Sequence, residues 1–403
     1  MRMSVRRLFS VFLLFLPPAL HASFIESTMG TAVVNDATAT YHNPAALTLF
    51  KTPQYIVLGS IADFRSEFTG NVMSTLNNSV QSGRAKTHAN YYLPSMYLST
   101  PIQEKWRIGI AIVSNTLNSS LDETSILRYN RPNTQIQSID AIPALALQLN
   151  DYLSVGLGLN YSYARFTSKP ITGFPALNMP DTQSHNVADD TSFGGNAGFV
   201  IKPTRSTLIG FNYRSAVSYQ LRGSSQFRGI SRITSHQYNF NYWTPARSVL
   251  TLSHFITPDL GFISTVQRIQ WSIFDTGIVH GVATQVGTQA TILPKVTVPY
   301  HFRDTWTFTV GGIKKINPQW VVRVAGTYDQ SPSNGHYQLA NGDTMAIGAS
   351  FGYEIYKNWI IDGSYSHAFI KAQNIDIISK NNKITGLNQS AGNSVSLKLT
   401  VNL

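Results

Sequence analysis

Apolar and polar residues alternate strictly along several stretches of this chain. Over residues 153–163 every second residue is apolar, and the residues between them are Ser, Gly or Asn. Similar alternation runs over residues 345–355 and again over 395–403 at the end of the sequence. A period of two places successive side chains on opposite faces of a β-strand. The pattern predicts an all-β protein whose strands carry one apolar face and one face of mostly small or polar residues.

The length of these runs indicates where such strands would lie. Soluble strands usually extend over about 5–6 residues, whereas a tilted membrane-spanning strand needs about 9–11. After residue 22, no stretch of the sequence approaches the roughly 18 consecutive apolar residues that a spanning helix requires. The runs therefore favour an outer-membrane β-barrel. The alternative is a secreted β-sandwich or propeller.

Short polar segments of turn-forming residues separate many of the runs. They lie at residues 100–105, 150–151, 202–206, 257–259, 317–319 and 357–358. An aromatic residue follows four of these segments at once or nearly so, namely Trp106, Tyr152, Trp320 and Trp359. Pro and Asn favour turn dihedrals, and aromatic rings at one end of successive strands are typical of a membrane interface. We expect these turns to join neighbouring strands at the periplasmic side.

Seven longer polar connections alternate with the short turns. They cover residues 66–87, 115–138, 167–190, 223–241, 272–299, 329–343 and 371–393. With a first strand near residues 55–64 and a last near 394–403, this layout predicts 14 antiparallel strands. An even number brings both ends of a barrel to the periplasmic side. Closure of the barrel satisfies every backbone hydrogen bond in lipid.

The N-terminal end has the features of a secretory signal peptide over residues 1–22. A basic start with Arg2, Arg6 and Arg7 precedes a short apolar run that ends at two prolines. Its removal leaves 28 basic and 20 acidic residues, a net charge of +8. Because the basic residues are scattered and the protein is exported, we expect contact with anionic outer-membrane lipid and lipopolysaccharide, and no nucleic-acid partner.

Residues 23–54 interrupt the alternation and are rich in small side chains. Asn35 or Asp36 can cap a short helix, and Pro44 suits a first helical position. A compact segment ahead of the first strand can fill the lumen of a barrel as a plug, or it can extend into the periplasm as a tail. Composition alone leaves both possibilities open.

The order of residues in this segment is similar to a known family. Asn35-Asp36-Ala37 followed by Tyr-His-Asn-Pro-Ala-Ala-Leu at 41–47 resembles the N-terminal hatch of the FadL-type outer-membrane transporters of fatty acids and hydrocarbons (OMPP1/FadL/TodX). Segments 161–165, 328–332 and 359–369 resemble later parts of the same family, in the same order. The resemblance implies a 14-stranded antiparallel transmembrane β-barrel over residues 55–403 with long extracellular loops. A hatch over 23–54 would lie inside its lumen.

The resemblance also implies roles for individual residues. The expected hatch residues are Phe24, Asn35, Asp36, Asn43, Pro44 and Ala45. Arg165 and Lys169, near the upper end of the fifth strand, are candidates to bind the carboxylate of a fatty acid in an apolar pocket; the alternative, favoured for each residue singly, is a solvated charge at the edge of a loop. The third strand of the family carries a Gly where the wall kinks, and Asn115 is the nearest substitute here. Apart from the resemblance, Asp329 could pair with an inward Arg and help hold the hatch, or it could form an ordinary Asx turn ahead of Pro332.

Catalytic and metal-binding motifs are absent from the sequence. There is no Gly-x-Ser-x-Gly, no His-Glu-x-x-His and no cysteine. We therefore expect neither an enzyme nor a cofactor or metal site, although a hydrolase assembled from loop residues would escape such a search. A monomer is expected.

The resemblance implies passive transport of long-chain fatty acids or other hydrophobic compounds. Substrate would be captured by the outer loops, held in an apolar pocket and released sideways into the membrane. Two alternatives are a general diffusion porin, which needs an open lumen rich in charge, and an adhesion barrel that acts through its loops. The sequence does not choose between fatty acids and aromatic hydrocarbons.

Overall fold

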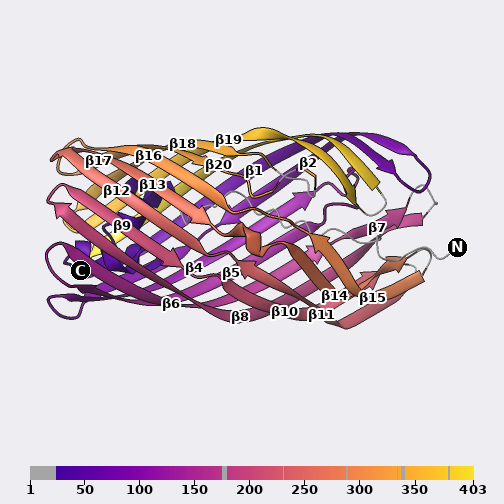
Figure 1. The fold of residues 1–403 in the computed structure, drawn as a ribbon, viewed down its shortest axis with the longest axis horizontal. Helices are drawn as coiled ribbons and strands as arrows, with labels where there is room; N and C mark the ends of the chain where they lie inside the picture. Colours follow the sequence, from indigo (N-terminus) through magenta and orange to yellow (C-terminus); the bar gives the residue numbers. More distant parts are fainter. Residues whose placement is uncertain are drawn as a thin grey trace.

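The computed structural model describes residues 24–174, 179–229, 231–286, 289–333, 335–336, 341–379 and 382–403. The signal peptide expected over residues 1–22 lies outside these ranges. The described chain forms one closed antiparallel β-barrel with strongly tilted strands (Figure 1). This confirms the predicted fold class.

Twenty strand segments make up the barrel wall. In chain order they are β1 (Gln54–Ser74), β2 (Val80–Tyr92), β3 (Ser95–Pro101), β4 (Trp106–Leu121), β5 (Asn133–Gln148), β6 (Leu153–Lys169), β7 (Ile171–Phe174), β8 (Met179–Thr204), β9 (Thr207–Arg214), β10 (Val217–Arg228), β11 (Arg232–Thr244), β12 (Arg247–Thr257), β13 (Leu260–Ile269), β14 (Thr276–Val286), β15 (Gln289–Pro299), β16 (Thr305–Lys315), β17 (Trp320–Asp329), β18 (Thr344–Tyr356), β19 (Trp359–Ser379) and β20 (Asn382–Asn402).

Several neighbouring segments belong to one strand of the barrel. β2 and β3 keep a single register against β1, since Ile61 pairs with Tyr92 and Leu58 pairs with Ser95 on either side of Pro94. β7 likewise continues β6 beyond Pro170, since Ser168 pairs with Asn186 and Ile171 with Gln183 of β8. Four further pairs of segments each form one strand, although the register shifts between the two segments of some pairs: β9 and β10, β11 and β12, β13 and β14, and β15 and β16. The ring then has the 14 strands that the sequence predicted. It closes where β1 pairs with β20, from Gln54↔Asn402 to Ser74↔Asn382.

The six predicted short turns all join neighbouring strands, but several of the long polar connections are not loops. Residues 66–87 and 371–393 are mostly strand, because β1, β2, β19 and β20 continue their ladders through them. Alternation of apolar residues ends where a strand leaves the bilayer, since water then faces it. The backbone hydrogen bonds between strands do not depend on those side chains, so the strands extend further than the pattern indicates.

Outward-facing side chains form an apolar band around the barrel. Leu157, Ile347 and Leu397 are more than 60% exposed, whereas their strand neighbours point into the lumen. Large aliphatic side chains exposed all round a barrel are typical of a surface that contacts lipid. No helix in the described part of the chain is long and apolar enough to cross a membrane.

The segment before β1 lies inside the lumen, so the alternative of a periplasmic tail is not what the structure shows. Four short helices follow one another: α1 (Phe24–Met29), η2 (Thr31–Val33), α2 (Ala39–His42) and η3 (Pro44–Leu49). They are drawn in indigo inside the end of the barrel that holds the C-terminus (Figure 1). Ile25, Ala37 and Leu47 are fully buried against the wall. We call residues 24–49 the hatch.

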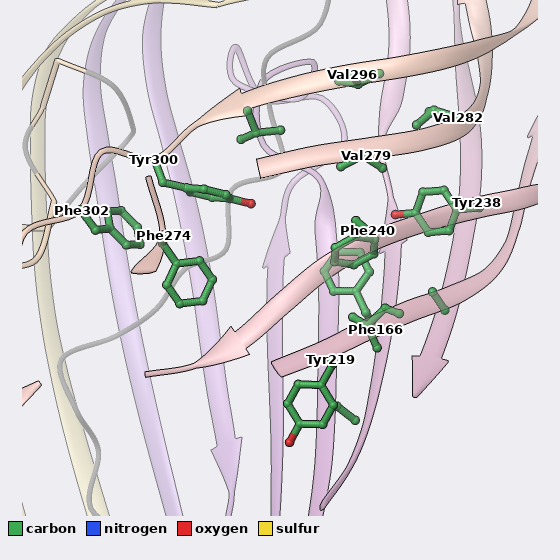
Figure 2. Packing of buried hydrophobic residues seen from close by; sticks show 14 of the residues in the cluster. Phe166, Tyr219, Tyr238, Phe240, Phe274, Val279, Val282, Val296, Tyr300 and Phe302 are labelled. Atoms are coloured by element: carbon green, nitrogen blue, oxygen red, sulfur yellow. The ribbon is translucent and has the colours of Figure 1, made fainter. Parts of the chain in front are cut away.

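The other half of the lumen is narrowed by the β14–β15 hairpin and an aromatic cluster. The Ala283 backbone N–H donates to Ser225 Oγ at 2.8 Å, and Ser184 Oγ donates to the Ala283 carbonyl at 2.9 Å. Ser184 and Ser225 are buried on the luminal faces of β8 and β10, so the hairpin leans across the lumen. Figure 2 shows Phe166, Tyr238 and Phe240 between this hairpin and the wall.

The barrel wall is irregular where strands nine and ten bend. Between β13 and β14 the chain forms a short helix, η5 (Trp271–Ile273), and residues 300–304 between β15 and β16 lie outside any strand. The backbone N–H groups of Tyr300 and Phe302 still donate to the carbonyls of Asp275 and Phe274. Phe274 fills this region, with ring centroids 5.9 Å from Trp243 and 5.7 Å from Tyr300. Packed aromatic side chains therefore fill the region in which the regular strand ladder is interrupted.

Candidate functional site: a hatched lumen

A buried charge network ties the hatch to the barrel wall. Lys398 Nζ on β20 donates to Asp36 Oδ2 of the hatch at 2.7 Å and lies 3.4 Å from Asp362 Oδ2 on β19. Arg323 on β17 completes the network, with NH1 3.0 Å from Asp362 Oδ1. Lys398 is only 1% exposed. A buried charge is stable only when an opposite charge lies close to it. The network therefore favours the one position of the hatch in which Asp36 contacts Lys398.

Asn43, one of the hatch residues expected from the family resemblance, holds the turn at which η3 begins. Its Nδ2 donates to the carbonyls of Ala32 at 2.7 Å and Phe199 at 3.2 Å, and its Oδ1 accepts from Ala45 N at 3.2 Å. Pro44 begins η3, as its fixed φ predicts. One fully buried side chain thus joins two parts of the hatch to β8.

Two wall glycines let the hatch approach the strands closely. A Cβ atom on Gly156 of β6 would lie 2.3 Å from Ala45 N, and one on Gly198 of β8 would lie 2.2 Å from Asn43 Oδ1. Atoms cannot approach that closely without displacement. The Gly-rich luminal face that the alternation indicated therefore has a specific use, because it makes room for the turn at Asn43 and Pro44.

Next to the hatch lies a partly open pocket, called the internal pocket, whose volume including its opening is about 740 Å³. Phe24 of the hatch contributes to its lining, together with Ala62 and Phe64 of β1. The remaining lining comes largely from small Ser, Thr, Ala and Gly side chains on β16 to β20. Asp329 is the one ionisable residue that lines it within the described part of the chain, and no Lys, Arg or His does. The pocket suits an uncharged, apolar portion of a ligand.

Asp329 occupies a different position from the one its expected role requires. It lies in the pocket wall, 5% exposed, and accepts a hydrogen bond from Thr307 Oγ1 at 2.5 Å. The carboxylate that joins the hatch to an inward cation is Asp36. Asp36 was singled out by sequence as a hatch residue, but its partner Lys398 was not.

Arg165 and Lys169 do not line the lumen, which corrects the expectation that they contact substrate in an internal pocket. Ala164, Phe166 and Ser168 of β6 are buried on the luminal face, so the odd-numbered residues point outward. Both basic side chains are exposed on the outer face. The strand was identified correctly, but the side of the wall was not.

Asn115 does not mark a kink in the wall. β4 and β5 pair in constant register through this position, with Ser114↔Ile139, Asn115↔Ser138 and Thr116↔Gln137. Asn115 lies on the luminal side of β4 yet is exposed, so it faces a hydrated part of the lumen. The nearest interruption is at Leu93–Pro94 on the neighbouring strand, where proline lacks a backbone donor.

A second pocket, of about 620 Å³, lies where the polar connections meet. It is lined by His301, Arg303 and Lys371, with Asp343 as the acidic member. Arg303 Nε donates to the Ser331 carbonyl at 3.1 Å, and its NH2 lies 3.9 Å from Asp343 Oδ1. The residues come from three distant segments, so no local motif in the sequence indicated this pocket. No group of three or more His, Cys, Asp or Glu suited to a metal occurs in the described ranges.

A closed barrel with an apolar outer band, a seated hatch and an internal pocket defines an outer-membrane transporter of the hatch-containing class. Residues 27–402 match the model of one family, described as outer membrane protein transport protein (OMPP1/FadL/TodX). The chain belongs to this family, and the protein lies in the outer membrane. The resemblance stated from sequence is confirmed.

Relatives within the family are distant but nearly full-length. The chain is 25% identical over 374 residues to the long-chain fatty acid transport protein of Escherichia coli O6:H1, covering 83% of this chain and 82% of that protein. It is 22% identical over 387 residues to outer membrane protein P1 of Haemophilus influenzae, covering 85% of this chain and 82% of that one.

Two solved structures share the fold. A Pseudomonas aeruginosa FadL homologue superposes with a TM-score of 0.80 at 21% identity, over 92% of this chain and 95% of that one. The Pseudomonas putida toluene transporter TodX superposes with a TM-score of 0.72 at 14% identity, over 98% and 100% of the two chains. At these identities the likeness concerns the barrel and not the ligand.

Proposed function

We propose that this protein carries hydrophobic molecules across the outer membrane passively, without catalysis or a cofactor. The observation that carries the proposal is the obstructed lumen, in which the hatch occupies one end and the aromatic cluster and the β14–β15 hairpin narrow the other. Transfer of water or ions into such a lumen is unfavourable in free energy. A lipid-soluble molecule instead moves from one apolar environment to another. The substrate classes named for its relatives are long-chain fatty acids and toluene.

The two pockets suggest how an amphiphilic substrate is oriented. Arg303 and Lys371 replace Arg165 and Lys169 as our candidates for contact with a carboxylate, since they share a cavity. Asp329 and Thr344 line the internal pocket. Ser331 and Asp343, which lie within two residues of them in sequence, line the second pocket, so the two pockets adjoin. An alkyl chain would occupy the first and its carboxylate the second. A neutral aromatic molecule would need only the internal pocket.

Binding to the purified, refolded barrel tests this proposal. Oleate, toluene and a hydrophilic sugar are titrated separately, and the intrinsic tryptophan emission reports occupancy. Saturable binding of oleate or toluene without sugar binding supports transport of hydrophobic molecules. Binding of neither, together with a large open conductance in planar bilayers, would establish the porin instead. If deletion of the outer hairpins abolishes attachment to cells and leaves lipid uptake unchanged, the result would favour the adhesion barrel.

A pocket-filling variant shows whether the internal pocket is the binding site. Ala62→Phe places a ring in the lining, because Ala62 is 2% exposed on the luminal face of β1. Ile347→Phe adds an aromatic ring on the lipid-facing side of β18 and is the matched control. We expect Ala62→Phe to weaken binding about tenfold or more, the effect of losing roughly 1.4 kcal/mol of contact. An equal effect of both variants would contradict the assignment.

A further inference from the structure

Five basic side chains project from the outer face of the barrel on three strands, two of which are separated by β8. They are Arg165 and Lys169 on β6, Arg222 and Arg228 on β10, and Arg232 on β11, and we call them the basic belt. All five are exposed, and the residues beside them in sequence, such as Phe166, Leu221 and Phe227, are buried on the luminal face.

The strand register places the members of the belt close together. Arg165 pairs with Asp189 of β8, and Asp189 in turn pairs with Arg222 of β10. Two strand spacings of about 4.8 Å therefore separate the backbones at Arg165 and Arg222 by roughly 10 Å. Arg228 pairs directly with Arg232 across β10 and β11. The belt is thus one continuous patch and not a set of scattered charges.

The protein itself does little to neutralise this patch. Asp189 is the carboxylate that lies within it, and none of the five basic residues forms a salt bridge inside the described ranges. On β1 and β2, by contrast, Arg65 lies 3.0 Å from Asp63 and Arg84 lies 3.4 Å from Glu67. Like charges directly opposite one another destabilise a sheet, so Arg228 and Arg232 are best accommodated when an external anion lies between them.

The height of the belt on the barrel indicates where that anion comes from. Tyr161 of β6 and Phe193 of β8 pair across the strands on the same outer face, with ring centroids 5.1 Å apart. Exposed aromatic pairs of this kind are typical of the membrane interface. Arg165 follows four residues beyond Tyr161, about 13 Å along the strand, on the side away from the short turns. Arg165 and Arg222 therefore lie level with the headgroups of the outer leaflet, and Arg228 and Arg232 lie about 20 Å farther along the strands.

We propose that the basic belt binds the phosphate groups of lipopolysaccharide in the outer leaflet. A guanidinium group binds phosphate through two parallel hydrogen bonds, and a lipid that carries several phosphates can engage several members of the belt at once. The acyl chains of the same lipid would then lie along the apolar band below Tyr161 and Phe193. The inference rests on the location of the barrel in the outer membrane and is independent of which substrate it transports.

A pair of matched triple variants tests the proposal. R165Q/R222Q/R228Q removes three charges from the belt, and R65Q/R84Q/K383Q removes three exposed charges that lie near carboxylates, since Lys383 Nζ is 3.9 Å from Asp376 Oδ1. Lipopolysaccharide is titrated into each purified barrel in detergent, and bound lipid is counted by native mass spectrometry. We expect the belt variant to bind at least about tenfold more weakly and the control variant to bind as the wild type does.

Two further measurements keep the test decisive if a triple variant fails to fold. Wild-type protein is titrated with lipopolysaccharide whose phosphates have been removed, and with phosphatidylglycerol vesicles. Loss of binding on dephosphorylation, with weaker binding of phosphatidylglycerol, supports the proposal. Undiminished binding of the dephosphorylated lipid, or an equal loss in both triple variants, would overturn it. Uptake of hydrophobic substrate is measured in parallel, and failure of that function alone leaves the lipid result unaffected.

Discussion

Lys398 of the last long strand lies 2.7 Å from Asp36 of the hatch, and the two residues are 362 positions apart in sequence. Both are buried, and Asp362 and Arg323 extend the contact into β19 and β17. The hatch is therefore locked to the part of the wall that also borders the internal pocket. Movement of the hatch requires either separation of this ion pair or motion of the wall with it.

Removal of one partner from this pair is expected to release the hatch. Lys398→Met leaves Asp36 and Asp362 buried without their shared cation, at a cost of about 3–5 kcal/mol. The free energy of unfolding in urea measures the loss, and conductance in planar bilayers reports an unseated hatch. D36N/K398M removes charge from both partners and should recover part of the stability. If K398M and the exposed-site control K383M behave alike, the ion pair does not hold the hatch.

Substitution of a wall glycine should displace the hatch without any change in charge. Gly156→Ala places a methyl group 2.3 Å from Ala45 N, and overpacking of this kind costs about 1–3 kcal/mol. Gly59→Ala is the control, because a Cβ atom at Gly59 meets nothing within 4 Å. We expect higher bilayer conductance and faster proteolysis of residues 24–49 in the first variant only. Equal behaviour of the two would show that the hatch does not depend on close contact with β6.

The turn between β12 and β13 should make stability depend on pH in the acid range. Hydrogen bonds from Lys314 and Thr257 lower the pKa of Asp259 to about 2 from its ordinary value of 3.8. Because the folded-state pKa is depressed, the stabilisation is present above about pH 4 and is lost as the pH falls towards 2.

Unfolding in urea across this range measures the effect. Asp259→Asn should reduce the loss of unfolding free energy that the wild type shows between pH 4 and 2. Asp151→Asn changes a carboxylate in the comparable turn between β5 and β6 and is the control. A wild-type acid profile in D259N would contradict the role of the Lys314 contact.

The irregular wall between strands nine and ten should depend on its aromatic packing. Phe274→Ala removes a ring that is 2% exposed and contacts Trp243, Tyr300 and Phe302, at a cost of about 3–5 kcal/mol. The emission of Trp243 and Trp271 should shift to longer wavelength as water enters. Phe193→Ala, on the outer face, should leave the emission unchanged. An unshifted spectrum in F274A would show that the interrupted ladder is compensated elsewhere.

The strands and the short turns could be predicted from the sequence because they depend on residues that are adjacent in the chain. The alternation over residues 153–163 correctly predicted β6 and its two faces, and each short turn was recognised from Pro, Asn and Asp. The hatch was predicted only through its family resemblance, since its composition also suited a tail. The extended hairpins at residues 66–87 and 371–393 were missed, because pairing outside the bilayer leaves no alternation to read.

The sequence by itself determined the barrel, since a period of two, a strand length and a turn composition are properties of adjacent residues. It did not support a luminal Arg165, because the same period places Arg165 on the face of the apolar residues 153–163, and the luminal role came from the family resemblance alone. Nor did it pair Asp36 with Lys398, or gather Arg303 and Lys371 into one pocket. These contacts join residues that are 362 and 68 positions apart, so the tertiary structure alone decided them.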